Sequence, residues 1–346
     1  YIAISLVAPK PRPAEQPEKR FKTILASGDT SEEELPCWID QWWDQSKQDA
    51  PIDDAEVFMS VVVPAYNEEE RLSGMLEEAV AFLQEEYGDA HGSEVEAKKP
   101  VGHGWEILVV SDGSTDKTIE TALKFARDHQ LEQYPVPVPG PRTPKPTRST
   151  QIPHGSIRVI ELAQNRGKGG AVTHGMRHVR GQYVVFADAD GASRFEDLAA
   201  LVQGCQKLED AKGRAVAIGS RAHLVGSEAV VKRSALRNFL MHSFHLLLRF
   251  MTPPATSKIK DTQCGFKLFS RPSLPYIIPY MHSEGWIFDV EMLMLAESAN
   301  IPVAEIAIGW KEVMGSKLNV IRDSINMAWG LAVLRAAWAL GVYKRR

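Results

Sequence analysis

Cysteine is scarce in this chain of 346 residues. Its three cysteines, Cys37, Cys205 and Cys264, lie far apart and show no Cys-x-x-Cys spacing. This usage argues against a disulfide framework and a cysteine-ligated zinc site, and it fits a reducing compartment. An excess of basic charge is also missing, because the net charge is -4 at pH 7. Nucleic acid is therefore not the expected partner.

Long uninterrupted apolar runs are missing as well. The opening segment, residues 1–8, is apolar but too short to cross a bilayer alone, so we interpret it as the stub of an N-terminal membrane anchor or as a disordered start. The segment 319–346 predicts an apolar helix with Arg335 near its middle. A charge at the bilayer centre costs about 2.5–3.5 kcal/mol. This cost favours a helix lying in the membrane interface, and docking against a second copy as a homodimer is the alternative.

Strand and helix patterns alternate through much of the chain. Short apolar, β-branched runs predict strands at 57–63, 105–110, 157–162, 183–187 and 215–219. Helical spacing of apolar residues predicts helices at 69–86, 115–128, 169–179 and 195–208. Such units predict an α/β fold with a mostly parallel, Rossmann-like sheet and helices on both faces. Further on we expect a helix at 232–251, then a segment at 261–269 to which no type is assigned, a helix at 288–298 and a strand at 303–308.

Composition divides the chain into regions. Residues 9–55 are polar apart from a tryptophan-containing patch, and we expect a linker that docks its tryptophans on the following domain. The domain itself is expected over residues 57–312, with surface insertions at 88–104 and 134–156. The stretch 235–251 fits an interfacial helix and, nearly as well, a buried core helix.

Two carboxylates follow the strand predicted to end at residue 187. Asp188 and Asp190 are one residue apart, and Gly191 releases the chain from the sheet after them. Ligands bind at the carboxyl ends of strands in open α/β sheets, and such a pair can hold a divalent cation that also binds substrate phosphates. Taken alone, the pair is also typical of a solvated acidic turn.

Three other predicted strand ends carry polar groups. Pro64 is expected to end the first strand, and the turn after it offers an aromatic face, an amide and a carboxylate from Tyr66, Asn67 and Glu68. The second strand delivers Asp112, a hydrogen-bond acceptor for a base, and Ser114, which also suits a helix cap. The third places Arg166 and Lys168 at a glycine-rich helix start, which favours phosphate although the spacing is not that of a P-loop. Together these groups predict a nucleoside diphosphate site.

In this order, the motifs at 64–68, 112–116, 165–169 and 188–191 resemble those of the inverting family 2 glycosyltransferases of GT-A fold. The resemblance covers roughly residues 57–312. The motifs at 261–267 and 286–291 resemble those of the polyprenyl-phosphate sugar transferases within that family, most closely those that act on dolichyl phosphate.

The resemblance implies transfer of glucose from UDP-glucose to dolichyl phosphate with inversion, as a glucose donor for protein N-glycosylation at the cytosolic face of the endoplasmic reticulum membrane. It also implies a cofactor, Mg²⁺ or Mn²⁺, held by Asp188 and Asp190. Mannose transfer from GDP-mannose is one alternative, although Ala192 stands where many mannosyl relatives carry an amide ligand. A catalytically silent nucleotide-sugar-binding membrane protein is the other. The implied nucleotide-sugar site comprises Pro64, Tyr66, Asn67, Glu68, Asp112, Ser114, Arg166, Lys168, Asp188 and Ala189.

The acceptor needs little help from a base. A phosphate monoester has a second pKa of about 6, so it is largely a dianion at neutral pH. The candidates for holding this phosphate are Arg221, Arg233, Gln263 and Lys267. Asp261 is a candidate to orient the acceptor or a basic residue, or to act as a catalytic base. Asp289 and Glu291 compete for that catalytic role, although acids also suit the first turn of a helix.

Overall fold

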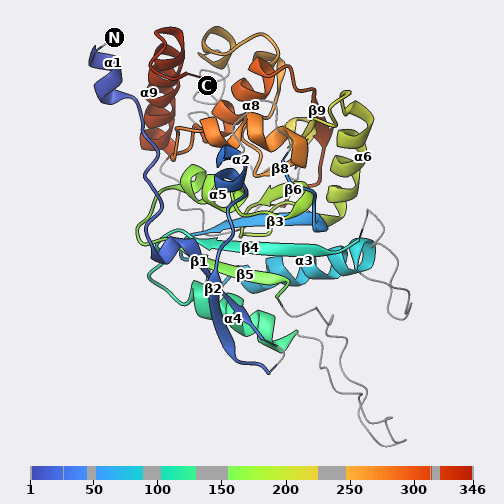
Figure 1. The fold of residues 1–346 in the computed structure, drawn as a ribbon. Coiled ribbons are helices and arrows are strands. Elements are labelled where there is room, and N and C mark those ends of the chain that lie inside the picture. Colours follow the sequence, from blue (N-terminus) through green and yellow to red (C-terminus); the bar gives the residue numbers. More distant parts are fainter. Residues whose placement is uncertain are drawn as a thin grey trace, which may run out of the picture.

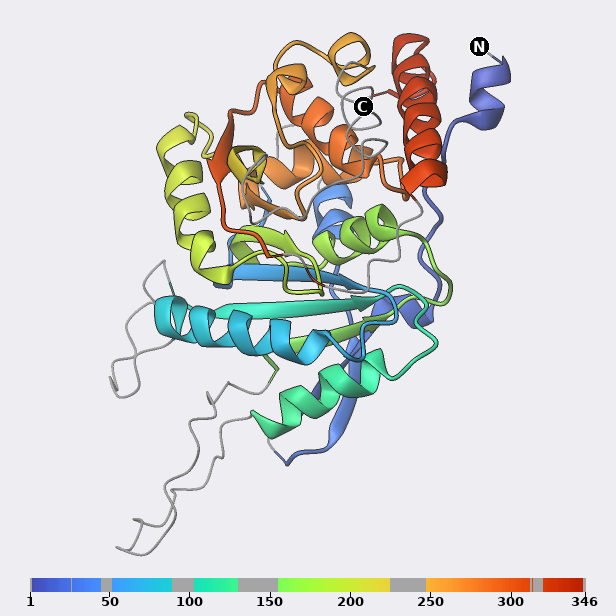
Figure 2. The same cartoon turned by 180° about the vertical axis from the view of Figure 1, so that it is seen from behind.

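The computed structural model describes residues 2–25, 27–44, 52–88, 103–129, 155–224, 247–311, 313 and 320–344. These residues form a nine-stranded sheet with helices on both faces (Figures 1 and 2). In chain order the strands are β1 (Arg20–Ile24), β2 (Thr30–Glu34), β3 (Val57–Ala65), β4 (Trp105–Ser111), β5 (Ile157–Glu161), β6 (Gly181–Ala187), β7 (Val216–Ser220), β8 (Phe266–Ser270) and β9 (Val303–Ala307). The helices are α1 (Ile2–Val7), α2 (Trp38–Asp44), α3 (Leu72–Tyr87), α4 (Thr118–Asp128), α5 (Lys168–Met176), α6 (Leu198–Leu208), α8 (Phe288–Ser298) and α9 (Val320–Ala339).

The order of strands across the sheet is β2-β1-β5-β4-β3-β6-β8-β7-β9. The central strands β5, β4, β3 and β6 run parallel, which confirms the expected parallel arrangement for the strands that carry the motifs. Antiparallel pairs flank them: β1 pairs with β5 on one side, and β8 lies between β6 and β7 on the other. The carboxyl ends of the four central strands therefore meet at one edge of the sheet.

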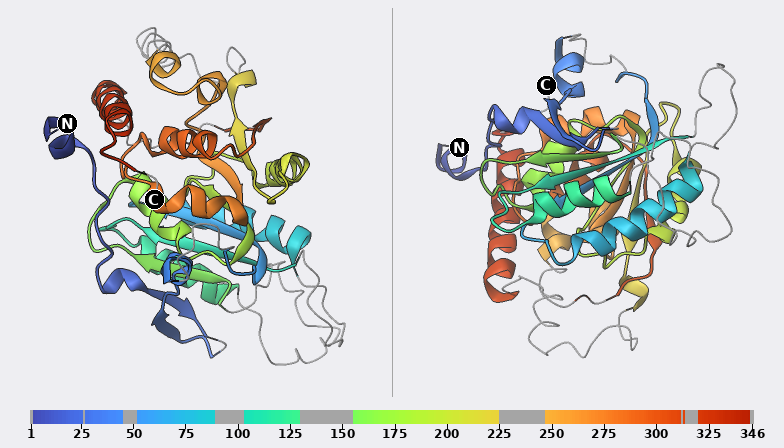
Figure 3. Two further views of the ribbon diagram at one scale, coloured as in Figure 1. Left: turned by 45° about the horizontal axis from the view of Figure 1, so that its top comes forward. Right: turned by 90° about the horizontal axis from the view of Figure 1, so that it is seen from below.

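Three layers of helices surround this sheet. Apolar side chains of α3, α4 and α6 pack on one face, and those of α2, α5 and α8 pack on the other. A further cluster joins α9 to the outer side of α8. Figures 1 and 3 show α1 beside α9, so the N-terminal helix belongs to this outermost layer.

The segment 9–55, expected as a linker, instead adds two strands to the sheet. Phe21 and Ile24 of β1 are buried, and Thr23 donates a hydrogen bond from its hydroxyl to the carbonyl of Ile157, 2.9 Å away. β1 has only two apolar side chains among polar and charged neighbours, so its composition does not indicate a strand. Its partner strand β5 lies far along the chain. The expected docking of a tryptophan is confirmed: Trp38 is buried, and its indole donates to the carbonyl of Met176 over 2.7 Å.

Two buried histidines of the α5 region hold this N-terminal segment. His174 donates from Nε2 to the carbonyl of Glu18 over 2.9 Å, and His178 donates from Nδ1 to the carbonyl of Pro36 over 2.8 Å. Burial lowers the pKa of His174 to about 4 and that of His178 to about 3. Both side chains are therefore neutral in the folded protein at neutral pH.

We expect stability to fall as the pH drops from about 6.5 toward 4, where the unfolded chain binds these protons and the folded chain does not. Above the histidine pKa of the unfolded chain, the two histidines cause no loss in the free energy of unfolding. Between about pH 6.5 and 4, each histidine lowers this free energy by roughly 3 kcal/mol at most. Denaturant unfolding followed across this pH range measures the effect. The free energy of unfolding of His178→Gln, which lacks one titrating group, should fall less steeply with decreasing pH. Parallel curves for the variant and the wild type would contradict the assignment.

Other expected features fall partly outside the described residues. The insertions at 88–104 and 134–156 and the helix expected at 232–251 are described only at their edges, whereas the C-terminal helix is confirmed as α9. Among the residues that the structure describes, no helix is both long and apolar enough to cross a membrane.

Candidate functional site

The two acids of the 188–191 turn lie at the end of β6. Asp188 accepts a contact from the Lys168 ammonium, with 2.6 Å between Nζ and Oδ1, and Asp190 accepts a hydrogen bond from the Ala192 amide over 3.0 Å. Gly191 has a φ of 67°, which lets the chain turn immediately behind the acids. Burial and then the negative charge of Asp188 raise the pKa of Asp190. A divalent cation would relieve this repulsion, so the pair fits the metal that the sequence predicts.

Other protein ligands are few at this position. In the described part of the chain, no group of three or more histidine, cysteine, aspartate or glutamate side chains gathers as a metal site would require. Ala189 and Ala192, beside the acids, are buried. Among the described side chains at this turn, Asp188 and Asp190 are thus the carboxylates that could hold a cation.

Lys168 is the first residue of α5, and its ammonium lies between acids. Burial alone would lower its pKa, but the charges of Asp188 and then Asp289 outweigh this effect and raise the pKa of Lys168. The side chain is 16% exposed. It therefore carries a full positive charge at the edge where phosphates are expected.

A backbone contact shapes the space around Asp188. A Cβ atom added to Gly265 would lie 2.0 Å from Asp188 Oδ2, so no side chain fits at this position without displacing the carboxylate. Sequence reasoning missed Gly265 as a site residue, although it stands within the 261–267 motif.

We expect Gly265→Ala to displace Asp188 and to lower the affinity for a divalent cation with a nucleoside diphosphate by about tenfold, as changes next to a metal ligand commonly do. Titration calorimetry measures this affinity. Gly74→Ala on α3 is the control, because nothing lies within 4 Å of its added Cβ. Equal affinities in the two variants would refute the role of Gly265.

Asp112, at the end of β4, is buried and binds the neighbouring loop. Its carboxylate accepts hydrogen bonds from the amides of Arg166, over 2.6 Å, and Gly167, over 2.9 Å. Burial raises its pKa, and the two amide hydrogen bonds oppose the rise. The expected base acceptor thus also holds the β5 end against the β4 end, and it retains lone pairs for a ligand.

The turn after β3 is built from side chain to backbone contacts. Asn67 adopts a φ of 55°, and its amide oxygen accepts from the Thr115 amide over 2.7 Å, while Ser114 accepts from the Asn67 amide over 3.1 Å. Glu68 pairs with Arg71 over 2.6 Å. Tyr66 is 42% exposed and offers its ring to a ligand.

The expected effect of Pro64 on the sheet is only half confirmed. Pairing of β3 with β6 stops at Val62, but pairing with β4 continues through Pro64 to Ala65. Proline lacks an amide hydrogen, so it ends the pairing on the side to which that amide would donate and leaves the other side intact.

Arg166 is directed toward the N-terminal segment. Its guanidinium is buried, lies 2.5 Å from the Glu18 carboxylate and donates to the carbonyls of Arg12, over 2.7 Å, and Pro13, over 2.8 Å. These contacts occupy the donors that the sequence assigns to phosphate. Glu18 is a site-supporting residue that sequence reasoning missed, because its polar surroundings are typical of a linker.

Arg221 and Asp261 form a bidentate ion pair beyond the end of β7. The guanidinium donates from Nε and Nη2 over 2.8 and 2.9 Å, and the Arg221 amide adds a third hydrogen bond over 2.9 Å. Burial alone would raise the pKa of Asp261, but hydrogen bonds and charge from Arg221 lower it. Asp261 is therefore a weak base, and its geometry corresponds to the alternative role of orienting a basic residue.

The Arg221 side chain remains 32% exposed, and its guanidinium lies 5.8 Å from the ring centre of Trp310. Asp261 fixes one edge of the guanidinium, and no other described residue forms a hydrogen bond with the opposite edge, so that edge suits an anion. Among the expected phosphate ligands, Arg221 is the one whose described geometry suits that role.

Four of the expected acceptor or catalytic residues are placed differently. Lys267 is fully buried and contacts Asp289, which is also buried. Glu291 is fully buried and accepts from the amides of His282 and Ser283 over 3.0 and 2.7 Å, so it holds a turn. Gln263 donates from its amide to the sulfur of Met327 in α9 over 3.6 Å. Arg233 lies outside the described residues.

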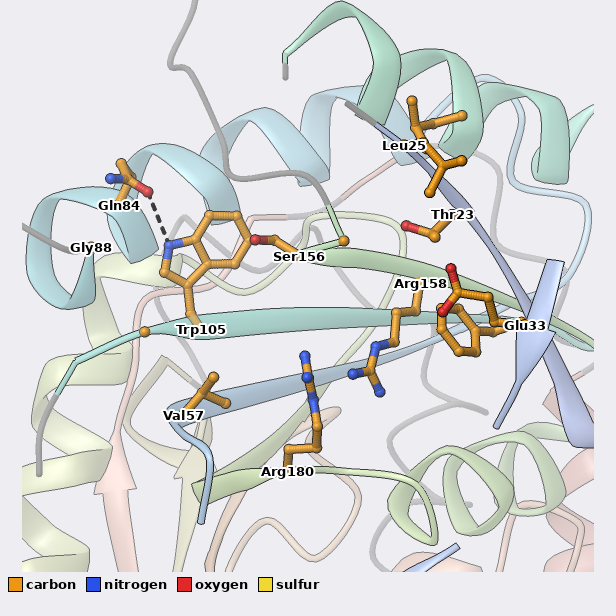
Figure 4. A pocket seen from close by; sticks show the side chains of 14 residues that line it. Thr23, Leu25, Glu33, Val57, Gln84, Gly88, Trp105, Ser156, Arg158 and Arg180 are labelled. Atoms are coloured by element: carbon orange, nitrogen blue, oxygen red, sulfur yellow. Dashed lines mark hydrogen bonds between the residues drawn. The ribbon is translucent and has the colours of Figure 1, made fainter. Parts of the chain in front are cut away.

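A sizeable cavity lies away from these groups. Its volume is about 460 Å³, and it is lined by residues near the starts of β3, β4 and β5, at the opposite edge of the sheet (Figure 4). The Trp105 indole donates to Gln84 over 3.2 Å on one wall, and Figure 4 shows Arg180 rising from below while Arg158 comes down from β5. Both arginines share the buried carboxylate of Glu106. The strand-end chemistry, and not this cavity, therefore defines the candidate site.

The chain was compared with known proteins. The family model "Glycosyl transferase family 2" matches residues 60–136 and 141–274. The chain is 42% identical to a dolichyl-phosphate beta-glucosyltransferase of Saccharomyces cerevisiae, over 99% of this chain and 91% of that one. It is 40% identical to the protein of that name from Dictyostelium discoideum, over 85% and 78%, and 37% identical to that from Homo sapiens, over 83% and 77%.

Among solved structures, the fold is similar to that of glucosyl-3-phosphoglycerate synthase from Mycobacterium tuberculosis. The complex with phosphoglyceric acid gives a TM-score of 0.51 at 17% identity, covering 81% of this chain and 80% of that one. The complex with Mn²⁺, UDP and glucosyl-3-phosphoglycerate gives 0.50 at 16% identity over the same shares. At this identity the likeness shows the fold alone, and it confirms the GT-A arrangement.

Proposed function

Because the chain belongs to glycosyltransferase family 2 and, within it, to the dolichyl-phosphate beta-glucosyltransferases, we propose that it transfers glucose from UDP-glucose to dolichyl phosphate. The products are the β-linked glucosyl lipid and UDP. The observation that carries the proposal is the 42% identity over 99% of the chain. The meeting of four motif-bearing strand ends at one sheet edge supports it.

The donor is held at that edge. The Tyr66 ring stacks on the uracil, and the Asp112 carboxylate accepts a hydrogen bond from it. Asp188 and Asp190 hold Mg²⁺ or Mn²⁺, which neutralises charge on the departing diphosphate. Lys168 lies 2.6 Å from Asp188, so its ammonium is placed to contact the same phosphates.

The acceptor approaches from the Arg221 side. A lipid phosphate that is already anionic needs positioning more than deprotonation. Arg221, oriented by Asp261, binds this phosphate through its open edge. An oxygen of the lipid phosphate then attacks the anomeric carbon of glucose from the side opposite UDP. The bond between this carbon and the UDP oxygen breaks, UDP leaves, and the configuration is inverted.

A lipid substrate requires contact with a membrane, and the outermost helical layer suits it. Large apolar side chains are exposed on α1, on α9 and beside residue 251: Ile2, Leu6, Val7, Phe250, Ile325 and Trp329. We propose that this layer faces the endoplasmic reticulum membrane from the cytosolic side.

We expect Trp329→Ser, which removes an exposed anchor, to weaken flotation with phospholipid vesicles, whereas Leu208→Ser on α6 should not. Equal flotation would remove α9 from the contact.

Purified protein with a divalent cation, dolichyl phosphate and labelled nucleotide sugar tests the reaction. Labelled lipid is expected from UDP-glucose and not from GDP-mannose. Product from GDP-mannose alone would establish the mannosyl alternative, and no product from either donor would refute the proposed transfer.

A further inference from the structure

The sheet contains a fully buried ion pair beside the candidate site. Lys267, in strand β8, is 0% exposed, and its ammonium donates to the carboxylate of Asp289, which is 3% exposed in the first turn of α8. Desolvation makes such a pair a weak source of stability, and apolar side chains of similar size often replace it without loss. Its location is therefore more informative than its strength.

Helix packing and electrostatic attraction connect this pair to the Asp188 carboxylate by way of Lys168. The starts of α5 and α8 pack so closely that a Cβ added to Gly169 would lie 2.5 Å from that of Phe288. These glycine and phenylalanine positions adjoin Lys168 and Asp289. The two charges therefore act on each other, and Lys168 also lies 2.6 Å from Asp188.

A second line runs through the backbone of β8. The Lys267 ammonium donates to the carbonyl of Cys264 over 2.6 Å. The next residue, Gly265, lies directly against the Asp188 carboxylate. The buried ammonium of Lys267 thus contacts both the start of α8, which packs against the start of α5, and the backbone next to Gly265.

We propose that Lys267 and Asp289 are positioning residues for the donor site: together they hold Gly265 against Asp188 and attract the Lys168 ammonium partly away from it, and so set the affinity for a divalent cation and a nucleoside diphosphate. This inference rests on the proposed function. Charges alternate along the line from Lys267 through Asp289 and Lys168 to Asp188. Asp289 attracts the Lys168 ammonium as Asp188 does, so Lys168 competes less strongly with a cation for Asp188.

The test replaces the pair while keeping the core filled and the net charge unchanged. Lys267→Met combined with Asp289→Leu removes both charges at similar volume, so folding is expected to persist. Mn²⁺ affinity, measured by electron paramagnetic resonance of the free ion, should fall about tenfold or more, and UDP affinity in the presence of Mn²⁺ should fall with it. The KM for UDP-glucose should rise more than the KM for the lipid.

Arg158→Met is the matched control, because it breaks a buried ion pair with Glu106 at the opposite edge of the sheet. It should lower the unfolding temperature and leave Mn²⁺ and UDP affinities unchanged. If the apolar double variant does not fold, Lys267→Gln with Asp289→Asn, which retains hydrogen bonding, provides the same test. Wild-type affinities in either folded double variant would overturn the inference.

These measurements separate the two proposals. A wild-type protein that forms no glucosyl lipid refutes the proposed function, whereas the Mn²⁺ and UDP titrations still compare the wild type with the double variant. A wild-type protein that is active, with a double variant of equal affinity, refutes only the positioning role.

Discussion

Replacing Asp190 with asparagine is expected to reduce glucose transfer by about 10²–10³-fold, the loss typical of removing one group that stabilises developing charge. The asparagine oxygen can still accept the Ala192 amide, so the turn keeps its shape. The substitution removes the negative charge of the Asp190 carboxyl group, whose pKa is raised by burial and by Asp188. Turnover at saturating UDP-glucose, measured over a range of Mn²⁺ concentrations, gives the size of the effect.

Two comparisons make this result specific. Glu77→Gln removes an exposed carboxylate of α3 and should leave turnover unchanged. Without ligand, the unfolding temperature of Asp190→Asn should match that of the wild type. With Mn²⁺ and UDP it should rise less than that of the wild type, because a ligand that binds more weakly stabilises the folded state less. Full activity in the variant would exclude Asp190 from the metal site.

The second large effect is expected at Arg221. Arg221→Lys keeps a positive charge but loses the bidentate contact with Asp261, and a lysine cannot reproduce the planar geometry. We expect kcat/KM for the lipid phosphate to fall about 100-fold, the loss of roughly two to three kcal/mol that a charged hydrogen-bonded pair commonly represents. Titration with UDP should give the wild-type affinity.

A double-mutant cycle with Asp261→Asn separates positioning from base catalysis. If Asp261 acts by orienting Arg221, the double variant should be no worse than Arg221→Lys alone, since the contact is already lost. Independent, multiplicative losses would show that Asp261 has a separate role, such as that of a base. The lowered pKa of Asp261 argues for the first result.

The central half of the fold was predictable because its signals are local. Each parallel strand is a short apolar run, and each motif follows such a run, so the meeting of Asp112, Lys168 and Asp188 at one edge follows from strand direction. The antiparallel strand β8 was not predictable in this way. Its place between β6 and β7 depends on pairing with residues far away in the chain, and that placement alone determines the burial of Lys267.

Side-chain roles were predicted less well than positions. Arg166 and Glu291 lie in the expected motifs, but both are saturated by partners, Glu18 for the first and the amides of His282 and Ser283 for the second. A motif indicates where a charged group stands and not which neighbour neutralises it. Asp190, Tyr66 and Arg221 keep exposed or unbalanced groups, so a ligand role at these positions stays a prediction that their geometry allows.

The contact between Glu18 and Arg166 also bears on how shortened forms of the protein should be designed. A fragment that begins at residue 57 would keep every motif but remove the Glu18 carboxylate and the Arg12 and Pro13 carbonyls from the Arg166 guanidinium, and would leave it the more distant Glu284 carboxylate at 3.5 Å. The uncovered charge would lie directly behind the loop that Asp112 holds. Expression fragments should therefore start upstream of Arg12, although the recognisable family match begins only at residue 60.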